Sequence, residues 1–249
     1  MKKIFIINGG QEFHGGGGTL NASITEWTRQ TLEELGYQVQ STCINDTYDP
    51  RAEAEKIAGA DVIIYHTPIW WFQLPYGLKQ YIDEVFIAGM DIICPNDGRS
   101  REEPERNYGT GGLMQGKKYM VTTTWNAPLG AFTQPNDFFD QTSVDDGVLF
   151  GFHKMNKFVG LSPLEGFHFY DVRKNGTPER IEAYKQAYLV PTKLSDRKAV
   201  YLGRETQERA DFIVRRLGDR GSNLSSFVEN IVRLHLEEYG EDIEKWRRL

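Results

Sequence analysis

The segment from Asp61 to Phe86 reads DVIIYHTPIWWFQLPYGLKQYIDEVF, and it decides the fold. Val62 to Tyr65 form a continuous apolar run, which is typical of a strand that is buried on both faces. Pro75 then opens a stretch in which apolar residues recur at helical spacing, namely Leu78, Ile82, Val85 and Phe86. A buried strand that leads directly into an amphipathic helix predicts one unit of an α/β fold.

Four aromatic or rigid residues lie between this strand and this helix: Pro68, Trp70, Trp71 and Phe72. In an open α/β sheet, the carboxyl ends of the strands are where ligands bind. A flat aromatic cofactor would suit such a loop. The alternative is that the tryptophans are ordinary core residues, since most aromatic clusters are core. The segment by itself leaves both interpretations open.

Strands and helices alternate along most of the chain. The pattern predicts strands at 3–8, 37–44, 60–67, 118–124 and 164–170, and helices at 19–35, 51–58, 75–88, 152–159 and 178–189. This alternation predicts a parallel sheet with helices on both faces, and five strands fit the flavodoxin-like order 2-1-3-4-5. Residues 91–116 interrupt the pattern with a long connection rich in glycine and charge, and such a connection is usually functional.

Composition excludes several classes of protein. The 249 residues are 39% hydrophobic and carry a net charge of -6, which argues against nucleic-acid binding by the whole chain. Cys43 and Cys94 show neither a metal-ligand spacing nor a disulfide framework, so we expect no metal site. No apolar run has the length of a signal peptide or a membrane span. A soluble cytoplasmic protein without a membrane partner is therefore expected.

A glycine-rich loop at 9–18 joins the first predicted strand to the first predicted helix. Glycines let backbone N–H groups approach a phosphate, and the N-terminus of a helix favours an anion. Thr19, Asn21 and Ser23 can donate further hydrogen bonds at this point. The loop is neither a Walker A motif nor a good Rossmann fingerprint. We expect it to bind a diphosphate, and the alternative is a flexible turn.

A third loop follows the fourth predicted strand, from Thr124 to Pro128. All three loops should meet at the carboxyl edge of the sheet. Backbone N–H groups of the third loop could bond the carbonyl and ring nitrogens of a flavin. Hydride chemistry would then belong to the cofactor, which agrees with the lack of any nucleophile–base pair or carboxylate dyad in the sequence.

Several motifs together resemble the FAD-dependent NAD(P)H:quinone reductases over about residues 1–190. They are Asn8-Gly9-Gly10 with Leu20-Asn21, Pro68-Ile69-Trp70-Trp71, Leu78 to Phe86, Tyr108 to Tyr119, Thr124 to Pro128, and Pro163-Leu164. The run Gly15 to Gly18 is richer in glycine than that family's pattern. The resemblance implies a homodimer in which NAD(P)H and a quinone take turns over FAD in ping-pong fashion. Residues of the partner subunit would close each site.

The resemblance also implies which residues form the site. On the diphosphate side it places Gly17, Thr19, Leu20 and Asn21. Around the isoalloxazine ring it places Pro68, Ile69, Trp70, Trp71, Phe72, Thr124, Trp125, Asn126 and Ala127, with Tyr108 as a candidate catalytic residue near the ring. Two histidines are added from their places in the sequence: His14, which lies in the phosphate loop, as a cofactor contact, and His153, which follows a phenylalanine-rich loop, as a candidate catalytic residue in the substrate pocket. An FMN electron carrier of the flavodoxin type is an alternative, and the long 91–116 insertion argues against it.

The tail changes character after the last predicted helix, which suggests domains at 1–192 and 197–249. Its strand–helix–helix pattern resembles the ribbon-helix-helix modules of mobile-element proteins. In that fold two chains pair their strands into a ribbon that can enter the major groove of DNA. Arg197, Lys198, Tyr201 and Arg204 are the candidate DNA contacts. A redox-responsive DNA-binding protein is therefore a second hypothesis, and a purely dimerising tail is a third.

Overall fold

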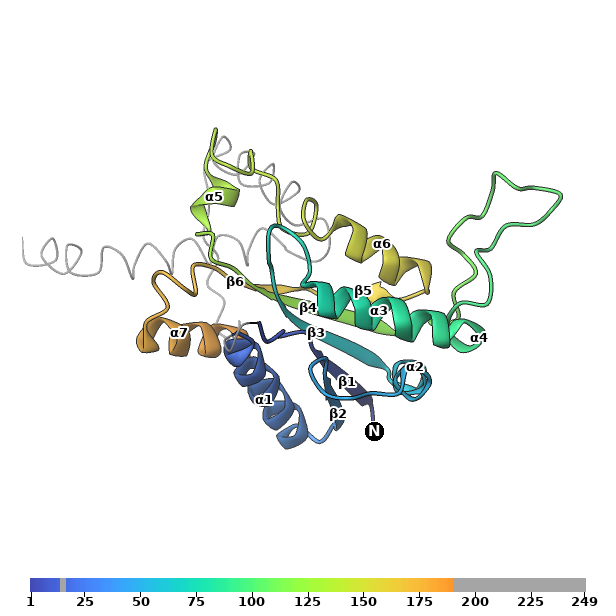
Figure 1. Cartoon of the computed structure of the whole chain (residues 1–249), viewed down its shortest axis with the longest axis horizontal. Coiled ribbons are helices and arrows are strands. Elements are labelled where there is room, and N and C mark those ends of the chain that lie inside the picture. Colours follow the sequence, from blue (N-terminus) through green and yellow to red (C-terminus); the bar gives the residue numbers. More distant parts are fainter. Residues whose placement is uncertain (14–16, 190–249) are drawn as a thin grey trace, which may run out of the picture. The chain divides into compact units, whose positions relative to one another are not determined.

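A computed structural model describes residues 1–13 and 17–189. The chain divides into two units, Met1–Lys193 and Leu194–Leu249, and the second unit lies outside the described residues. A parallel sheet forms the centre of the first unit (Figure 1). Its strands are β1 (Lys3–Asn8), β2 (Gln38–Cys43), β3 (Val62–Pro68), β4 (Lys118–Thr124), β5 (Ser162–Pro163) and β6 (Phe167–Phe169). The order β2-β1-β3-β4-β5 confirms the predicted flavodoxin-like arrangement.

The predicted fifth strand is divided into two short strands. β5 pairs with the beginning of β4, Ser162 opposite Lys118, and β6 pairs with its end, Phe167 opposite Thr122. Gly166 lies between them, where a Cβ atom would stand only 2.8 Å from the carbonyl oxygen of Val121. The backbone therefore passes too close to β4 at this point for any larger residue.

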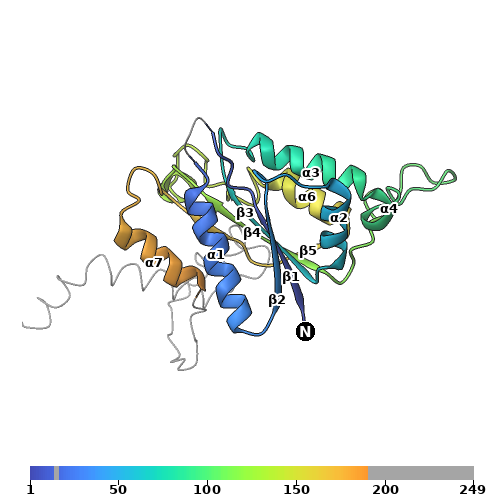
Figure 2. The ribbon, with the colours of Figure 1, turned by 60° about the horizontal axis from the view of Figure 1, so that its bottom comes forward.

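Helices cover both faces of the sheet, as the sequence predicts. They are α1 (Thr19–Glu34), α2 (Pro50–Gly59), α3 (Tyr76–Ala88), α4 (Met90–Ile93), α5 (Gly130–Thr133), α6 (Phe150–Phe158) and α7 (Pro178–Leu189). Figure 2 shows α1 and α7 on one face, with α2, α3 and α6 on the other. The sequence did not predict α4 and α5, because four residues are too few to show a helical period.

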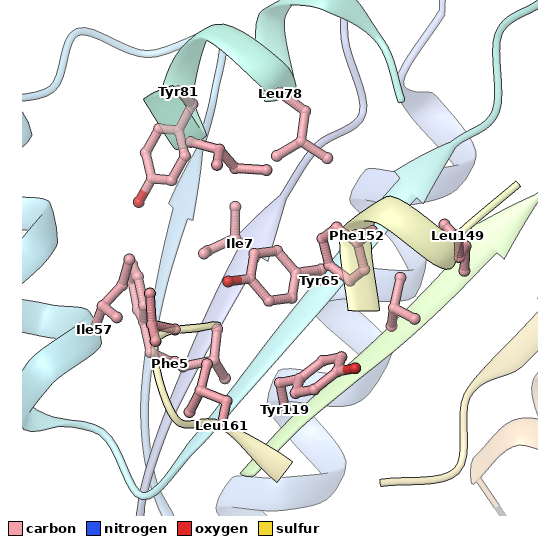
Figure 3. Packing of buried hydrophobic residues seen from close by; sticks show 14 of the residues in the cluster. Phe5, Ile7, Ile57, Tyr65, Leu78, Tyr81, Tyr119, Leu149, Phe152 and Leu161 are labelled. Carbon is pink, nitrogen blue, oxygen red and sulfur yellow. The ribbon is translucent and has the colours of Figure 1, made fainter. Parts of the chain in front are cut away.

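Side chains from the central strands alternate between two apolar layers. Ile4, Ile6 and Ile64 pack with residues of α1 on one face of the sheet. Phe5, Ile7, Ile63 and Tyr65 belong to the larger cluster on the other face, where Leu78 and Tyr81 of α3 and Phe152 of α6 cover them (Figure 3). Burial on both faces explains why β1 and β3 read as unbroken apolar runs.

The turn between β1 and α1 depends on two glycines that nearly touch. Gly18 precedes the first residue of α1 in a left-handed conformation with φ 75°. A Cβ atom on Gly18 would stand 2.4 Å from the carbonyl oxygen of Gly10. Only glycine satisfies both the dihedral angle and the close approach, so the path of this loop is set by these two residues.

Gly18→Ala is expected to destabilise the protein more than Gly36→Ala. Both glycines have positive φ, 75° and 84°, so both variants acquire backbone strain of about 1 kcal/mol. Only the new Cβ at position 18 also collides with backbone, since nothing lies within 4 Å at position 36. Overpacking of this kind costs about 1–3 kcal/mol more. Urea denaturation of both variants checks this, and equal losses in the free energy of unfolding would contradict it.

Candidate functional site

Three loops meet at the carboxyl edge of the sheet, as predicted. They follow β1, β3 and β4, and backbone hydrogen bonds join the strand ends from which they leave. The amide of Gly9 donates to the carbonyl of His66 at 2.7 Å, and the amide of Ile69 donates to the carbonyl of Thr124 at 3.0 Å. The side chain of Gln11 reaches farther, because its Oε1 accepts from the amide of Gly77 in the first turn of α3 at 2.8 Å.

The N-terminus of α1 opens at this edge in a form suited to an anion. The amides of Thr19, Leu20 and Asn21 begin the helix and so have no intrahelical acceptor. The first turn holds no acidic residue and no capping side chain. The partial positive charge of the helix end therefore faces the glycine loop without a neutralising group of the protein's own.

Asn21 adds a buried donor to this helix end. Its Oδ1 accepts from the hydroxyl of Thr124 at 3.3 Å, which ties α1 to the end of β4. Its Nδ2 is buried, and no acceptor for it lies within hydrogen-bonding distance among the described residues. A buried amide N–H without a partner is costly, so an acceptor atom from a ligand or water at this position would be stabilising.

The second loop is a tight turn with a strained backbone. Trp70 and Gln73 exchange two backbone hydrogen bonds of 2.9 and 3.0 Å across it. Trp71 and Phe72, the two central residues, have φ values of 48° and 64°. Positive φ at both central residues is the geometry that usually selects Asn-Gly or Gly-Gly, and bulky aromatic residues in it are outliers. Strain of this kind clusters at ligand-binding sites.

The turn presents one aromatic ring to solvent and packs the others. Trp71 is 92% exposed. Phe72 stacks on Phe138 with ring centroids 5.2 Å apart, and Phe139 meets it edge-on at 5.8 Å. Trp70 lies against the glycine loop, where Phe13 packs on it at 5.8 Å. The turn is therefore held on both flanks, whereas the ring of Trp71 has no buried contact to contribute to folding.

The side chain of Trp125 is packed inside the protein and is not open to a ligand. Its ring is buried against Phe132 at 4.9 Å, and its indole N–H donates to the hydroxyl of Thr123 at 2.6 Å. Its backbone amide donates to the carbonyl of Phe169 at 2.8 Å. Asn126 is exposed and Ala127 is half-buried beside it. From the third loop, Asn126 is therefore the better placed of the predicted residues to meet a ligand.

His153, predicted as a catalytic residue, has both ring nitrogens engaged inside the protein. Nδ1 lies 2.5 Å from the hydroxyl of Tyr119, and Nε2 lies 2.9 Å from Oδ1 of Asp145. Burial raises the pKa of Asp145, but hydrogen bonds from His153 and His168 outweigh it and hold that pKa below its usual value. The imidazole offers no unoccupied nitrogen to a substrate, so its geometry fits a structural role.

Tyr108, the other predicted catalytic residue, lies at the opposite end of the sheet. Its loop runs from the end of α4 to Lys118, where β4 begins, and parallel strands begin at the edge opposite their carboxyl ends. Tyr108 is 69% exposed, and its ring contacts Phe158 at 5.5 Å and the guanidinium of Arg99 at 5.4 Å. One chain does not bring Tyr108 to the three loops, so any contact there requires a second chain.

Several of the predicted residues lie outside the described part of the chain. These are His14 and the candidate DNA contacts Arg197, Lys198, Tyr201 and Arg204. Phe138, Phe139, Asp145 and Gln11 are site neighbours that sequence reasoning missed. Phe138 and Phe139 are far from the Trp71 turn in the sequence, so the sequence pattern did not indicate that they contact it.

Comparison with known proteins places the chain in a family. A family model described as a flavodoxin-like fold matches residues 2–190. The chain belongs to this family. A second model, for a protein of unknown function (DUF3408), matches residues 171–248. The structure of a Klebsiella pneumoniae protein provisionally assigned as a quinone reductase shares the fold with a TM-score of 0.62 and 20% identity, covering 90% of this chain and 99% of that one.

Two curated relatives align over most of their own length. The NADPH:quinone oxidoreductase MdaB of Haemophilus influenzae is 42% identical over 187 residues, which is 75% of this chain and 96% of the relative. An uncharacterized protein of Schizosaccharomyces pombe is 47% identical over 173 residues, 70% of this chain and 88% of the relative. Both alignments are long enough to include the three loops.

The described residues hold few other candidate sites. Among residues 1–13 and 17–189, no three histidine, cysteine or acidic side chains gather as metal ligands. Within the same ranges, every helix is too short or too polar to cross a membrane.

Trp71→Gly should be more stable than Trp71→Ala by about 1 kcal/mol, because both variants lose the exposed ring but only alanine keeps the strain of positive φ. At most positions in helices and strands the order is reversed, since glycine has the greater entropy in the unfolded chain. Chemical denaturation of the two variants beside the parent protein checks the order. An alanine variant as stable as the glycine variant would show that the turn is not strained.

Proposed function

We propose that this protein is an FAD-dependent NAD(P)H:quinone oxidoreductase. The observation that carries the proposal is the strained, exposed Trp71–Phe72 turn beside an uncapped helix N-terminus with a buried, unpartnered amide. A ligand that carries both a flat ring system and an anionic group fits these two features, with the ring at the turn and the anion at the helix N-terminus. The 42% identity to an NADPH:quinone oxidoreductase over 96% of that relative supports the same function.

The residues fit a flavin nucleotide in two places. Amides of Thr19, Leu20 and Asn21, together with the unpartnered Nδ2 of Asn21, would hold the diphosphate. Gly17 and Gly18 form a cradle that a side chain would close, because a Cβ atom on either would stand within 3 Å of a backbone oxygen. Trp71 and Phe72 would lie along the isoalloxazine ring. When bound, the flavin supplies hydride transfer from NAD(P)H to the quinone.

The chain's own side chains position the reactants and exclude water. Aromatic surface around the turn, from Trp71 and Phe138, favours flat apolar quinones over polar acceptors. Among the described residues, no acid–base pair stands free at the edge, since His153 is occupied by Tyr119 and Asp145. The proton that accompanies the hydride is therefore proposed to come from solvent at the open mouth of the site.

We also propose that the enzyme is a homodimer that completes each site with Tyr108 of the second subunit. A groove of about 1010 Å³ runs along α3 and α6, from Gln73 at the strained turn to Phe158. Its margins expose large apolar side chains, of which Ile87 is 72% exposed and Phe150 is 56% exposed. Apolar surface of this size commonly marks an interface.

The two ends of this groove suggest how the subunits pair. One end lies at the Trp71 turn, and Tyr108 packs on Phe158 at the other. A two-fold axis brings each end of a self-complementary patch over the opposite end of its partner. Such a dimer would carry Tyr108 of one subunit toward the flavin loops of the other.

Reconstitution with flavin tests the function directly. The purified chain should bind FAD, identified by chromatography after release, and should reduce quinones with NADPH or NADH in steady-state kinetics with parallel double-reciprocal lines. Trp71→Gly should keep the fold but lose most bound flavin, whereas Leu35→Ala, a change of another exposed apolar residue at the far end of α1, should not. Absence of flavin after reconstitution excludes the proposal, and FMN in its place corrects the cofactor.

Mixed dimers test the shared site. Tyr108→Ala and Trp71→Gly homodimers should each be weakly active, because every site carries a defect. Co-expressed together, they form hybrids in which one site has both defects and the other has none, which restores about a quarter of the parent activity. If the hybrids are no more active than the mean of the two variant homodimers, both residues belong to a site within one subunit, or Tyr108 lies outside the site.

A further inference from the structure

Asp145 contacts two histidines, one through each carboxylate oxygen. His153 on α6 lies 2.9 Å from its Oδ1, and His168 on β6 lies 3.6 Å from its Oδ2. The second ring nitrogens of both histidines are bonded to β4, since Nδ1 of His153 meets Tyr119 and Nδ1 of His168 lies 2.7 Å from the hydroxyl of Thr123. One carboxylate is thereby connected to both ends of β4.

The segment that carries Asp145 also carries the aromatic support of the strained turn. Residues 134–149 include Phe138 and Phe139, which pack on Phe72. Other hydrogen bonds of the segment are local, such as the amide of Phe139 to the carbonyl of Ala131 at 3.1 Å. Among the polar contacts of this segment, those of Asp145 with the histidines reach β4, while Val144 and Leu149 of the same segment are buried in the core.

Backbone strain makes this support consequential. Phe72 has a φ of 64°, and such a conformation persists only where the surroundings impose it. Its ring stacks on Phe138, which is itself a largely exposed residue on a segment without helix or strand. Movement of this segment would release the stack and leave the strained turn to its backbone hydrogen bonds between Trp70 and Gln73.

We propose that Asp145 is a positioning residue that fixes the 134–149 segment to the sheet, so that Phe138 holds the Trp71–Phe72 turn in its ligand-binding conformation. The proposal rests on the proposed flavin site. It assigns Asp145 no contact with flavin or substrate, and it gives His168 the same supporting role as His153. The two carboxylate oxygens serve two histidines, one by a hydrogen bond to His153 and the other by a longer polar contact with His168, which a neutral side chain of the same size cannot do equally well.

The test is a double-mutant cycle on flavin affinity. Asp145→Ala and Phe138→Ala should each raise the dissociation constant for FAD about tenfold, measured by quenching of flavin fluorescence well below the melting temperature of each variant. If Asp145 acts through Phe138, the double variant should bind no more weakly than the worse single variant. Asp146→Ala is the matched control, because it removes the same charge one residue away and, within the described residues, Asp146 bonds to nearby Ser143 rather than to the sheet.

Two results would overturn the proposal: flavin affinity unchanged in Asp145→Ala, or single effects that multiply in the double variant. If Asp145→Ala fails to fold, Asp145→Asn replaces it in the cycle, because asparagine keeps the side-chain volume and one hydrogen-bond acceptor. If the parent chain binds no flavin, the proposed function fails by itself. In that case the positioning role is tested by amide hydrogen exchange of residues 69–73 in the free protein. Asp145→Ala should increase the exchange rate of these residues, and Asp146→Ala should not. Unchanged exchange rejects the positioning role.

Discussion

Parallel pairing between β3 and β4 is the constraint on which the rest of the structure depends. The register runs from Val62 opposite Lys118 to Pro68 opposite Thr124, so both strands end at the same level. β1 ends beside them, with Asn8 opposite His66. Three loops that are distant in sequence are thereby brought to one edge. A shift of one residue in this register would turn every buried side chain of β4 to the other face of the sheet.

Rigid parts of the site differ in how they are held. The two ends of the glycine loop approach each other backbone to backbone, at Gly10 and Gly18, and Gln11 reaches α3. The aromatic turn is held by the backbone hydrogen bonds between Trp70 and Gln73 and by the stacking of Phe72 on Phe138, which lies on a segment without regular secondary structure. Backbone contacts are insensitive to most substitutions elsewhere, whereas stacking depends on the position of Phe138. Substitutions in residues 134–149 should therefore disturb the aromatic turn more than the two ends of the glycine loop.

Periodicity predicted the sheet and its covering helices well, because burial on both faces leaves an unmistakable apolar run in β1 and β3. It could not show that the fifth strand divides at Gly166, since that depends on the approach of Val121 from another strand. The position of the candidate site could be predicted from the loops that follow the predicted strands. For Trp125 and His153 the sequence could not show the packing, because aromatic and imidazole side chains look alike in sequence whether they face a ligand or bond to Thr123 and Tyr119. For Tyr108 it could not show the position, because a sequence does not say which end of the sheet a long insertion occupies.

The exposed ring of Trp71 carries a consequence for how this sequence arose. Nothing in the described fold rewards it, because it buries little surface and sits on a backbone that glycine would adopt with less strain. Random substitution under selection for stability alone would soon replace it, since many residues would fold as well there. The described fold alone gives no reason for a tryptophan at this position. Under the proposed function, the strain at Trp71 is a cost that the native state bears for binding.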